Sequence, residues 1–316
     1  MAKITQQEVR QILLITLSNI GDAILTTPVL EVLHQRFPKA AIDLVTDQRS
    51  SIVFNHCPYR GQIFHKDKKA GWQGLIQLIY QLRHTSYDLI VDLRTDGLAY
   101  LLKGQKRLTK WQAKPVGDHA VERHMAVIAS LLSSSIPIPS CRIWLQTAQI
   151  QFARKQLSQL PRNRWLALGP GANWTPKIWP VPAFSTLVQA VKAYFDGIIF
   201  IGSLDDQERS QRIAADISLP WVDLCGRTDL LQAAAVLQQA NVFVGNDSGL
   251  GHLAAAVGTP TFTVFGLGHP ERYHPWGKYS HWQVAPNNKL QELSGEMIAS
   301  QVIKLATYSQ KTYSGA

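Results

Sequence analysis

Residues Val242 to Ala256 read VFVGNDSGLGHLAAA, and this stretch identifies the chain as an α/β protein. A short apolar strand, Val242–Val244, ends in a polar turn, and small residues at helical spacing follow from Gly249. A strand that turns directly into a helix is the building unit of a parallel sheet covered by helices. The start of such a helix offers free N–H groups and a positive dipole end, which favour a bound anion.

The same alternation extends outward along the chain. In the first half the pattern predicts a buried strand over Ile12–Leu17 and one helix over Asp22–Phe37. Further strands are expected near Ile42–Val45, Gln62–Phe64 and Leu89–Val91, with helices over Ser51–Asn55, Leu75–Leu82 and His119–Leu132. In the second half, strands are expected over Trp165–Leu168, Ile198–Ile201, Val242–Val244 and Thr261–Phe265, with helices near 182–194, 205–217, 229–239, 249–257 and 290–307.

Residues 133–146 are rich in Ser and Pro and predict a linker between two domains. We therefore expect Rossmann-like domains over 1–146 and 147–316; whether the last helix packs back on the first domain stays open. The chain length of 316 residues suits two such domains. Two doubly wound domains in tandem leave a central cleft, and open α/β sheets bind ligands at the carboxyl ends of their strands.

The net charge of +10 favours an anionic partner: nucleic acid, an acidic membrane surface or a phosphorylated substrate. No apolar run reaches the roughly 18 residues of a membrane-spanning helix, and the N-terminus does not fit a signal peptide. Cys57, Cys141 and Cys225 lie far apart, which argues for a reducing compartment and against a zinc cluster. A cytoplasmic protein is expected. No nucleic-acid-binding motif is present, so nucleic acid is not expected as a partner.

Asp22 is the first candidate for chemistry. It follows Ser18, Asn19 and Gly21 at the end of the first strand, where a helix begins. Asp in a first helical turn is often only a favourable charge at the helix start. The alternative is a general base at the mouth of the cleft, which accepts a proton late, as a nucleophile attacks.

The second candidate is the loop after strand Trp165–Leu168, which reads GPGANWTPKIWP from Gly169 to Pro180. Gly171 and Asn173 would let backbone N–H groups approach a phosphate, and Lys177 would add a positive charge. The dinucleotide fingerprint is incomplete and the Walker pattern is absent, so a plain Gly- and Pro-rich turn remains an equal alternative.

The third candidate contains Asp247, Ser248, Gly249 and His252, at the start of the helix quoted above. An anion at the helix start and sugar hydroxyls on Asp247 would explain this composition, whereas an N-capped helix with an incidental His is the simpler alternative. No D-x-D motif occurs, and the pair Asp205-Asp206 is expected to cap a helix instead. The sequence thus predicts neither a metal site nor a cofactor.

Taken in order, these motifs resemble glycosyltransferase family 9, the ADP-heptose:lipopolysaccharide heptosyltransferase family. The resemblance runs from about residue 12 to residue 276. It rests on Ser18–Asp22 with Leu25–Pro28, Pro170–Ala172 with Lys177–Pro180, Gly245–Gly249 with His252–Ala255 and Gly258–Pro260, and Phe265-Gly266 with Pro270–Arg272. Any one motif is weak, but the ordered set is specific.

The resemblance implies a GT-B architecture, with the acceptor on the first domain and the nucleotide sugar on the second. It implies an inverting, metal-independent transfer, with ADP-heptose as the expected donor and a lipopolysaccharide core as the acceptor. Asp22 then looks like the general base and Lys177 like the phosphate-binding lysine. Gly171, Asn173, Asp247, Ser248, Gly249 and His252 look like the donor and diphosphate site.

The acceptor side is less well defined. Ser18, Asn19, Arg94 and Asp96 are expected to contact the acceptor, and Arg94, Arg107, Lys110 and Lys114 either face an anionic lipid-linked saccharide or form a solvated basic surface. Such an enzyme would work peripherally at the inner face of the cytoplasmic membrane. A catalytically silent sugar-nucleotide- or anion-binding protein of the same fold is the alternative.

Overall fold

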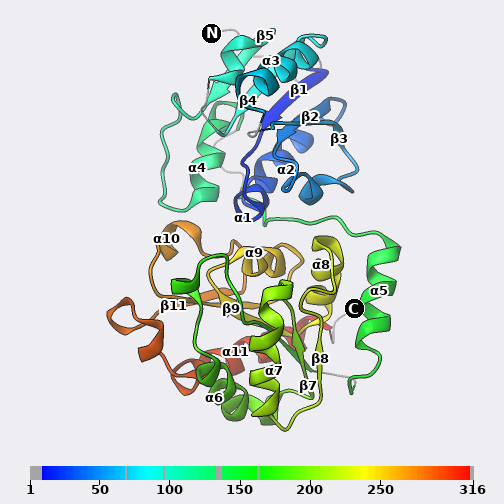
Figure 1. The fold of residues 1–316 in the computed structure, drawn as a ribbon. Coiled ribbons are helices and arrows are strands. Elements are labelled where there is room, and N and C mark those ends of the chain that lie inside the picture. The colour runs from blue at the N-terminus through cyan, green and yellow to red at the C-terminus, as the bar shows by residue number, and fades with distance from the viewer. Residues whose placement is uncertain (1–8, 68–69, 95–96, 133–136, 162–163, 314–316) are drawn as a thin grey trace. The chain divides into compact units, whose positions relative to one another are not determined.

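The computed structural model describes residues 9–67, 70–94, 97–132, 137–161 and 164–313, with side chains up to residue 308 (Figure 1). The chain divides into two compact units, Met1–Trp144 and Leu145–Ala316, and each is described by itself. In the described ranges, no helix has the length and apolar character needed to cross a membrane.

The first unit is built on a parallel sheet with strand order β3-β2-β1-β4-β5. These strands are β1 (Gln11–Ile15), β2 (Ala41–Thr46), β3 (Arg60–His65), β4 (Tyr87–Asp92) and β5 (Gly104–Thr109). Ile12 of β1 pairs with Ile42 on one side and with Leu89 on the other. The apolar run Ile12–Ile15 is fully buried, because helices cover both faces of the sheet.

Helices α1 (Ile20–Ile24), α2 (Thr27–Arg36), α3 (Gly71–Leu82) and α4 (Ala120–Val127) surround this sheet. Short 3₁₀ turns lie at η1 (Ser51–Phe54), η2 (Leu98–Leu101) and η3 (Ala129–Leu131). The single helix expected over 22–37 is wrong, since the chain breaks between α1 and α2. Pro28 lacks an N–H and suits a first helical turn. The hydroxyls of Thr26 and Thr27 donate to the carbonyls of Ala23 and Ile24, both at 2.7 Å, and so end α1.

The second unit has a parallel sheet of order β11-β10-β9-β6-β7-β8. Its strands are β6 (Trp165–Gly169), β7 (Gly197–Phe200), β8 (Trp221–Asp223), β9 (Val242–Asn246), β10 (Thr261–Phe265) and β11 (Ser280–Val284). In this unit the predicted strands are the buried central ones, β6, β7, β9 and β10. Strands β5, β8 and β11 lie at sheet edges and were not predicted, because they are short or mix polar with apolar residues, as in SHWQV of β11, whereas the edge strand β3 was predicted near Gln62–Phe64.

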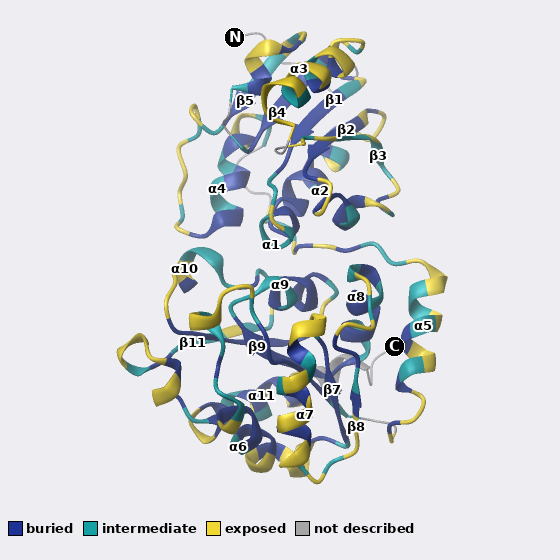
Figure 2. Cartoon of the chain, in the orientation of Figure 1, coloured by how far each residue is buried: buried dark blue, intermediate teal, exposed yellow. Residues whose placement is uncertain are grey.

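The helices of this unit are α5 (Thr147–Leu157), α6 (Val181–Val191), α7 (Gln207–Ala215), α8 (Leu230–Gln239), α9 (Gly249–Ala256), α10 (Pro270–Tyr273) and α11 (Gly295–Tyr313), and their inward faces are buried (Figure 2). Short 3₁₀ turns lie at η4 (Thr175–Lys177), η5 (Lys192–Tyr194), η6 (Leu204–Asp206), η7 (Pro286–Asn288) and η8 (Leu290–Glu292). Asp206 accepts hydrogen bonds from the backbone N–H and hydroxyl of Ser203, so the N-cap residue is Ser203, and Asp206 completes its capping box as the third residue of η6 rather than capping α7 with its own side chain. Helix α11 packs against α6 and β9, and Ile298 and Val302 join Phe184 and Leu187 in one core.

Substituting Gly295 tests the packing of α11 on α6. A side chain there would collide with the backbone of Leu187 and Ala183, which cannot rotate away. We expect Gly295→Ala to lower the free energy of unfolding by about 2 kcal/mol, measured by denaturant unfolding. The control is Ser300→Ala on the exposed face of the same helix, which should change stability little. Equal stability of the two variants would contradict this packing.

Candidate active site

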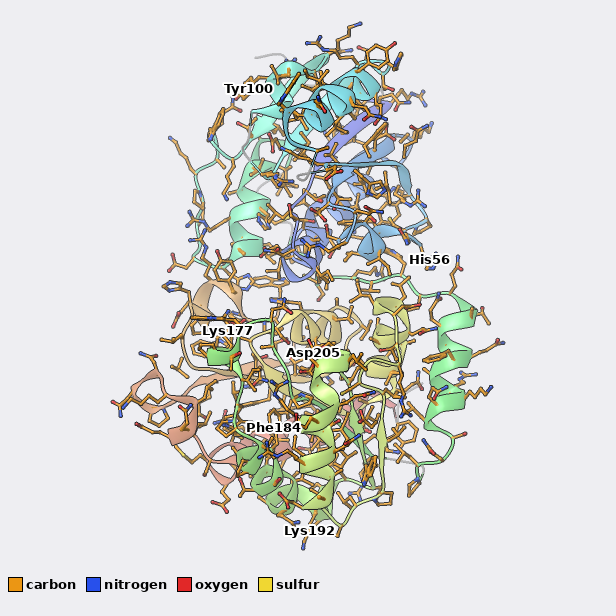
Figure 3. All side chains as sticks on the ribbon, viewed as in Figure 1. His56, Tyr100, Lys177, Phe184, Lys192 and Asp205 are labelled. Atoms are coloured by element: carbon orange, nitrogen blue, oxygen red, sulfur yellow. The ribbon has the colours of Figure 1, made fainter. Side chains whose placement is uncertain are left out.

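Three loops meet at the carboxyl edge of the sheet in the second unit. They follow β6, β9 and β10, which pair through Gly169 with Gly245 and Gly245 with Thr263. Because neighbouring parallel strands end at the same edge, residues 170–180, 247–248 and 266–269 are brought together there. Figure 3 shows Lys177 on the side of the unit that carries α9 and α10, with Lys192 at the opposite end.

Asn246, which the sequence analysis missed, fastens the first of these loops to β9. Its side chain is fully buried. The amide oxygen accepts a hydrogen bond from the Trp179 backbone N–H at 2.9 Å, and the amide nitrogen donates to the carbonyls of Gly171 at 3.2 Å and Gly169 at 3.4 Å. One side chain therefore holds both ends of the loop. The signal that could have identified Asn246 in the sequence is that it is a polar residue at the end of an apolar strand.

The far end of this loop is also fixed by Trp179. Its side chain is fully buried against Phe184, and the indole N–H donates to the Leu293 carbonyl at 2.8 Å. Lys177 lies two residues earlier, so its position along the loop is set by Trp179 and Asn246.

Lys177 forms an ion pair with Asp247, with Nζ and Oδ2 2.5 Å apart. The Asp247 side chain is 13% exposed and that of Lys177 is 30% exposed, so the ammonium group stays accessible to a ligand. A side chain at Gly268, in the loop after β10, would come within 3.4 Å of the same Asp247 oxygen. Gly268 also has a φ of 152°, which other residues rarely adopt. Asp247 thus lies between two loops and orients the lysine.

Ser248 lies at the start of α9 in extended conformation, with φ of −149° and ψ of 170°. It is the N-cap residue by position, but within the described residues its hydroxyl makes no capping bond to the helix. The hydroxyl oxygen is buried and has no hydrogen-bond partner in that part of the chain. The first N–H groups of a helix also lack partners inside the helix. A buried, unsatisfied hydroxyl beside them predicts a bound polar group.

The other residues predicted to bind the donor differ in their burial and in their position relative to the start of α9. Gly249 is the first residue of α9, and His252 is 8% exposed one turn further on. Gly171 is buried, and any side chain there would collide with the Asp206 carboxylate, so packing alone requires glycine. Asn173 is exposed on the loop.

Asp22 lies in the first unit, in the first turn of α1 at the carboxyl end of β1. Its carboxylate accepts a hydrogen bond from the side-chain amide of Asn19 at 2.9 Å, and Ser18 precedes them in the same turn. The Asp22 side chain is half-buried. A neutral amide therefore holds this carboxylate in place without neutralising its charge.

Arg94 follows β4, the neighbour of β1, so it lies at the same sheet edge as Asp22; its backbone N–H donates to Asp92 at 2.9 Å. Asp96 lies outside the described residues. Lys110 is half-buried and Lys114 exposed.

The structure corrects the interpretation of Arg107 as an acceptor ligand or a solvated surface charge. Its guanidinium donates to the backbone carbonyls of Ala99, Leu102 and Gly104, at 2.7–2.9 Å, and so closes the turn between η2 and β5.

Other kinds of chemistry find little support in the described residues. Cys57, Cys141 and Cys225 are free and buried, and burial raises the pKa of each thiol, that of Cys141 to about 12. A thiol that stays protonated is a poor nucleophile. Over the described ranges, no group of three or more His, Cys, Asp or Glu side chains lies close enough to hold a metal ion.

Solved structures place this fold among known enzymes. A glycosyltransferase family 9 protein from Veillonella parvula superposes with a TM-score of 0.83 at 20% identity, over 97% of this chain and 99% of the other. The Escherichia coli heptosyltransferase WaaC with ADP superposes with a TM-score of 0.75 at 21% identity, over 93% and 99%. Two parallel α/β units of this kind define the GT-B architecture of glycosyltransferases, which confirms the predicted fold class.

Sequence comparison then identifies the family. Residues 104–302 match the model of glycosyltransferase family 9 (heptosyltransferase). The chain is 26% identical over 283 residues to lipopolysaccharide heptosyltransferase 3 of Escherichia coli, covering 81% of this chain and 82% of that protein. It is 27% identical over 301 residues to lipopolysaccharide heptosyltransferase 1 of Pseudomonas aeruginosa, covering 82% and 79%. The chain belongs to glycosyltransferase family 9 and is a glycosyltransferase.

Replacing Asn246 by Asp tests the role of its amide. The carboxylate can still accept from the Trp179 N–H, but it faces the carbonyls of Gly169 and Gly171 without a donor. We expect the free energy of unfolding to fall by about 2 kcal/mol, measured by denaturant unfolding, and ADP affinity, measured by calorimetry, to fall with it. Asn173→Asp, on the exposed part of the loop, is the stability control. An Asn246→Asp protein as stable as the native one would show that the amide does not hold the loop.

Proposed function

We propose that this protein transfers a sugar, with heptose expected, from an ADP-linked donor to a lipopolysaccharide core acceptor. The family assignment and the relatives named as lipopolysaccharide heptosyltransferases support the substrate class. The WaaC structures with ADP and with ADP-2-deoxy-2-fluoro heptose, on the same fold, support the donor class. The proposal includes work at the inner face of the cytoplasmic membrane, where such an acceptor would be anchored.

The observation that carries the proposal is the arrangement around Ser248. A buried hydroxyl without a partner in the described chain, the free N–H groups of α9 and the Lys177 ammonium group come from the same sheet edge. Together they suit a diphosphate leaving group, whose charge grows as the sugar departs. Asp247 is already paired with Lys177, so its remaining acceptor capacity would serve sugar hydroxyls.

Asp22 is the proposed general base. It would take the proton from the acceptor hydroxyl while that oxygen bonds to the anomeric carbon and the bond from this carbon to the diphosphate oxygen breaks. Attack opposite the leaving group inverts the anomeric configuration. The proton ends on Asp22 and the negative charge on the diphosphate, held by the α9 N–H groups and Lys177. No step in this scheme requires a metal ion.

Replacing Asp22 by Asn tests the base. We expect kcat to fall by about 10²- to 10⁴-fold, since the amide cannot accept the proton, whereas ADP binding should be unchanged. The measurements are steady-state transfer and calorimetric titration with ADP. Asp118→Asn changes an exposed carboxylate of the same unit and should leave kcat intact. Equal turnover in Asp22→Asn and native protein would remove Asp22 from the mechanism, whereas native protein that binds ADP but transfers no sugar would favour a silent binding protein.

Lys177→Ala tests the leaving-group site. We expect kcat/KM to fall roughly 30- to 1,000-fold, because a charge that stabilises the leaving diphosphate is lost, and ADP affinity to fall as well. Lys192→Ala removes an exposed lysine from the same unit and serves as the control. Unchanged kinetics for Lys177→Ala would exclude it from the site.

A chelation experiment tests metal independence. We expect transfer to continue at its full rate in excess EDTA, because Lys177 and the α9 N–H groups supply the positive charge. Loss of activity that magnesium restores would contradict the proposed scheme.

A further inference from the structure

Helix α3 carries a stripe of exposed apolar side chains. Trp72, Ile76 and Tyr80 recur every four residues, so they lie on one face of the helix, and they are 70%, 55% and 68% exposed. The other exposed residues of the helix include Gln73, Gln77 and Gln81, and the helix contains no charged residue. A surface helix normally places charges on its solvent side. This outward face is therefore suited to a partner that excludes water.

The opposite face of α3 packs on the hydrophobic core of the first unit. Leu78 and Leu82 are buried in the core formed with Leu13 and Ile90, and Leu75 and Ile79 pack against the same cluster. The stripe is thus fixed in its outward direction.

A second segment extends this surface. The Arg83 guanidinium, at the end of α3, donates to the Leu101 carbonyl of η2 at 2.9 Å. Tyr100, which directly precedes Leu101, stacks on Trp111 with ring centroids 5.6 Å apart. Trp111 is 64% exposed, and Tyr100 and Leu101 are about half exposed. Figure 3 shows Tyr100 at the end of the unit where Figure 1 shows α3. We call Trp72, Ile76, Tyr80, Tyr100, Leu101 and Trp111 the aromatic face.

The two segments that carry the aromatic face contain basic residues and no carboxylate, and the nearest exposed carboxylate in the chain is Asp67, which accepts a hydrogen bond from the Ala70 N–H just before α3. No Asp or Glu occurs between Asp67 and Asp88, or from Gly97 to Gly117. These segments contain Arg83 and His84 in the first and Lys103, Lys106, Lys110 and Lys114 in the second, besides the inward-facing Arg107. Arg83, His84, Lys103 and Lys114 are exposed. Segments in which exposed Trp and Tyr stand among basic residues and carboxylates are lacking match the headgroup region of an anionic bilayer.

We propose that the aromatic face of the first unit is the surface with which this protein docks on an anionic lipid bilayer. Trp72, Ile76 and Tyr80 enter the headgroup region, and the flanking lysines contact the lipid phosphates. Aromatic burial and basic charge are both needed, since each signal alone gives weak and reversible binding. The inference extends the proposed action on a lipid-linked acceptor by naming the surface that meets the membrane.

The charge pattern favours lipid over a protein partner. A protein interface depletes lysine and pairs charges of both signs, whereas here lysines accumulate and carboxylates are missing from both segments. Phosphate groups at a bilayer surface complement such a pattern at every lysine.

The test is flotation of the full chain with vesicles of phosphatidylcholine alone, or with phosphatidylglycerol added. We expect native protein to float with the anionic vesicles, less as salt is raised, and little with the neutral ones. Trp72→Ser/Ile76→Ser/Tyr80→Ser should lower the partition coefficient by about tenfold or more. Lys103→Gln/Lys114→Gln should also lower it. The control Trp221→Ser removes an exposed Trp of the second unit and should float as native protein does.

Circular dichroism and thermal unfolding check that the variants fold. We expect them to fold, because the substituted side chains are exposed. Transfer to a lipid-free acceptor fragment should be unchanged in the triple variant, so failure of docking and failure of the proposed function give different results. Equal flotation of triple variant and native protein would overturn the proposal. So would native protein that does not float but self-associates in light scattering, with the triple variant monomeric, because the face would then be a protein interface.

Discussion

The candidate donor site depends on one buried amide, that of Asn246. It joins the end of β9 to both ends of the loop after β6, through the carbonyls of Gly169 and Gly171 and the N–H of Trp179. Lys177 precedes Trp179 by two residues and Asp247 directly follows Asn246, so their ion pair follows from this connection. Three satisfied hydrogen bonds in a fully buried position give such an amide a strong constraining effect.

The positive charge of the candidate donor site comes from one oriented side chain and from the backbone. A lysine among loop residues would have many rotamers, but the Asp247 carboxylate restricts its direction while leaving the ammonium accessible. The start of α9 adds partial positive charge that is fixed in the backbone and needs no reorganisation when a diphosphate leaves. The unsatisfied Ser248 hydroxyl marks where that ligand would complete the polar contacts.

The basic character of the chain is also distributed by structure. Arg107 and Arg60 each donate to three backbone carbonyls, so these guanidinium groups close turns rather than meet an anionic partner. Lys103 and Lys114, by contrast, are exposed, and they belong to the segment that carries Tyr100 and Trp111. The net charge of the chain therefore overstates the number of positive groups that are available to bind an anionic partner. The positions of the charged side chains indicate the binding surface better than the net charge does.

The sequence by itself determined the α/β class, the central strands and the order of the loops that carry Asp22, Lys177 and Ser248. These features follow from local periodicity and from turn residues, which depend on neighbours in the chain. It did not determine the edge strands β5, β8 and β11, the break at Pro28, or the partners of Arg107. Nor did it identify Asn246, the Lys177–Asp247 pair or the aromatic face of α3. Each of these depends on segments far apart in the chain that only folding brings together: Asn246 meets Trp179 across 67 residues, and the outward face of α3 is defined only once its other face is buried.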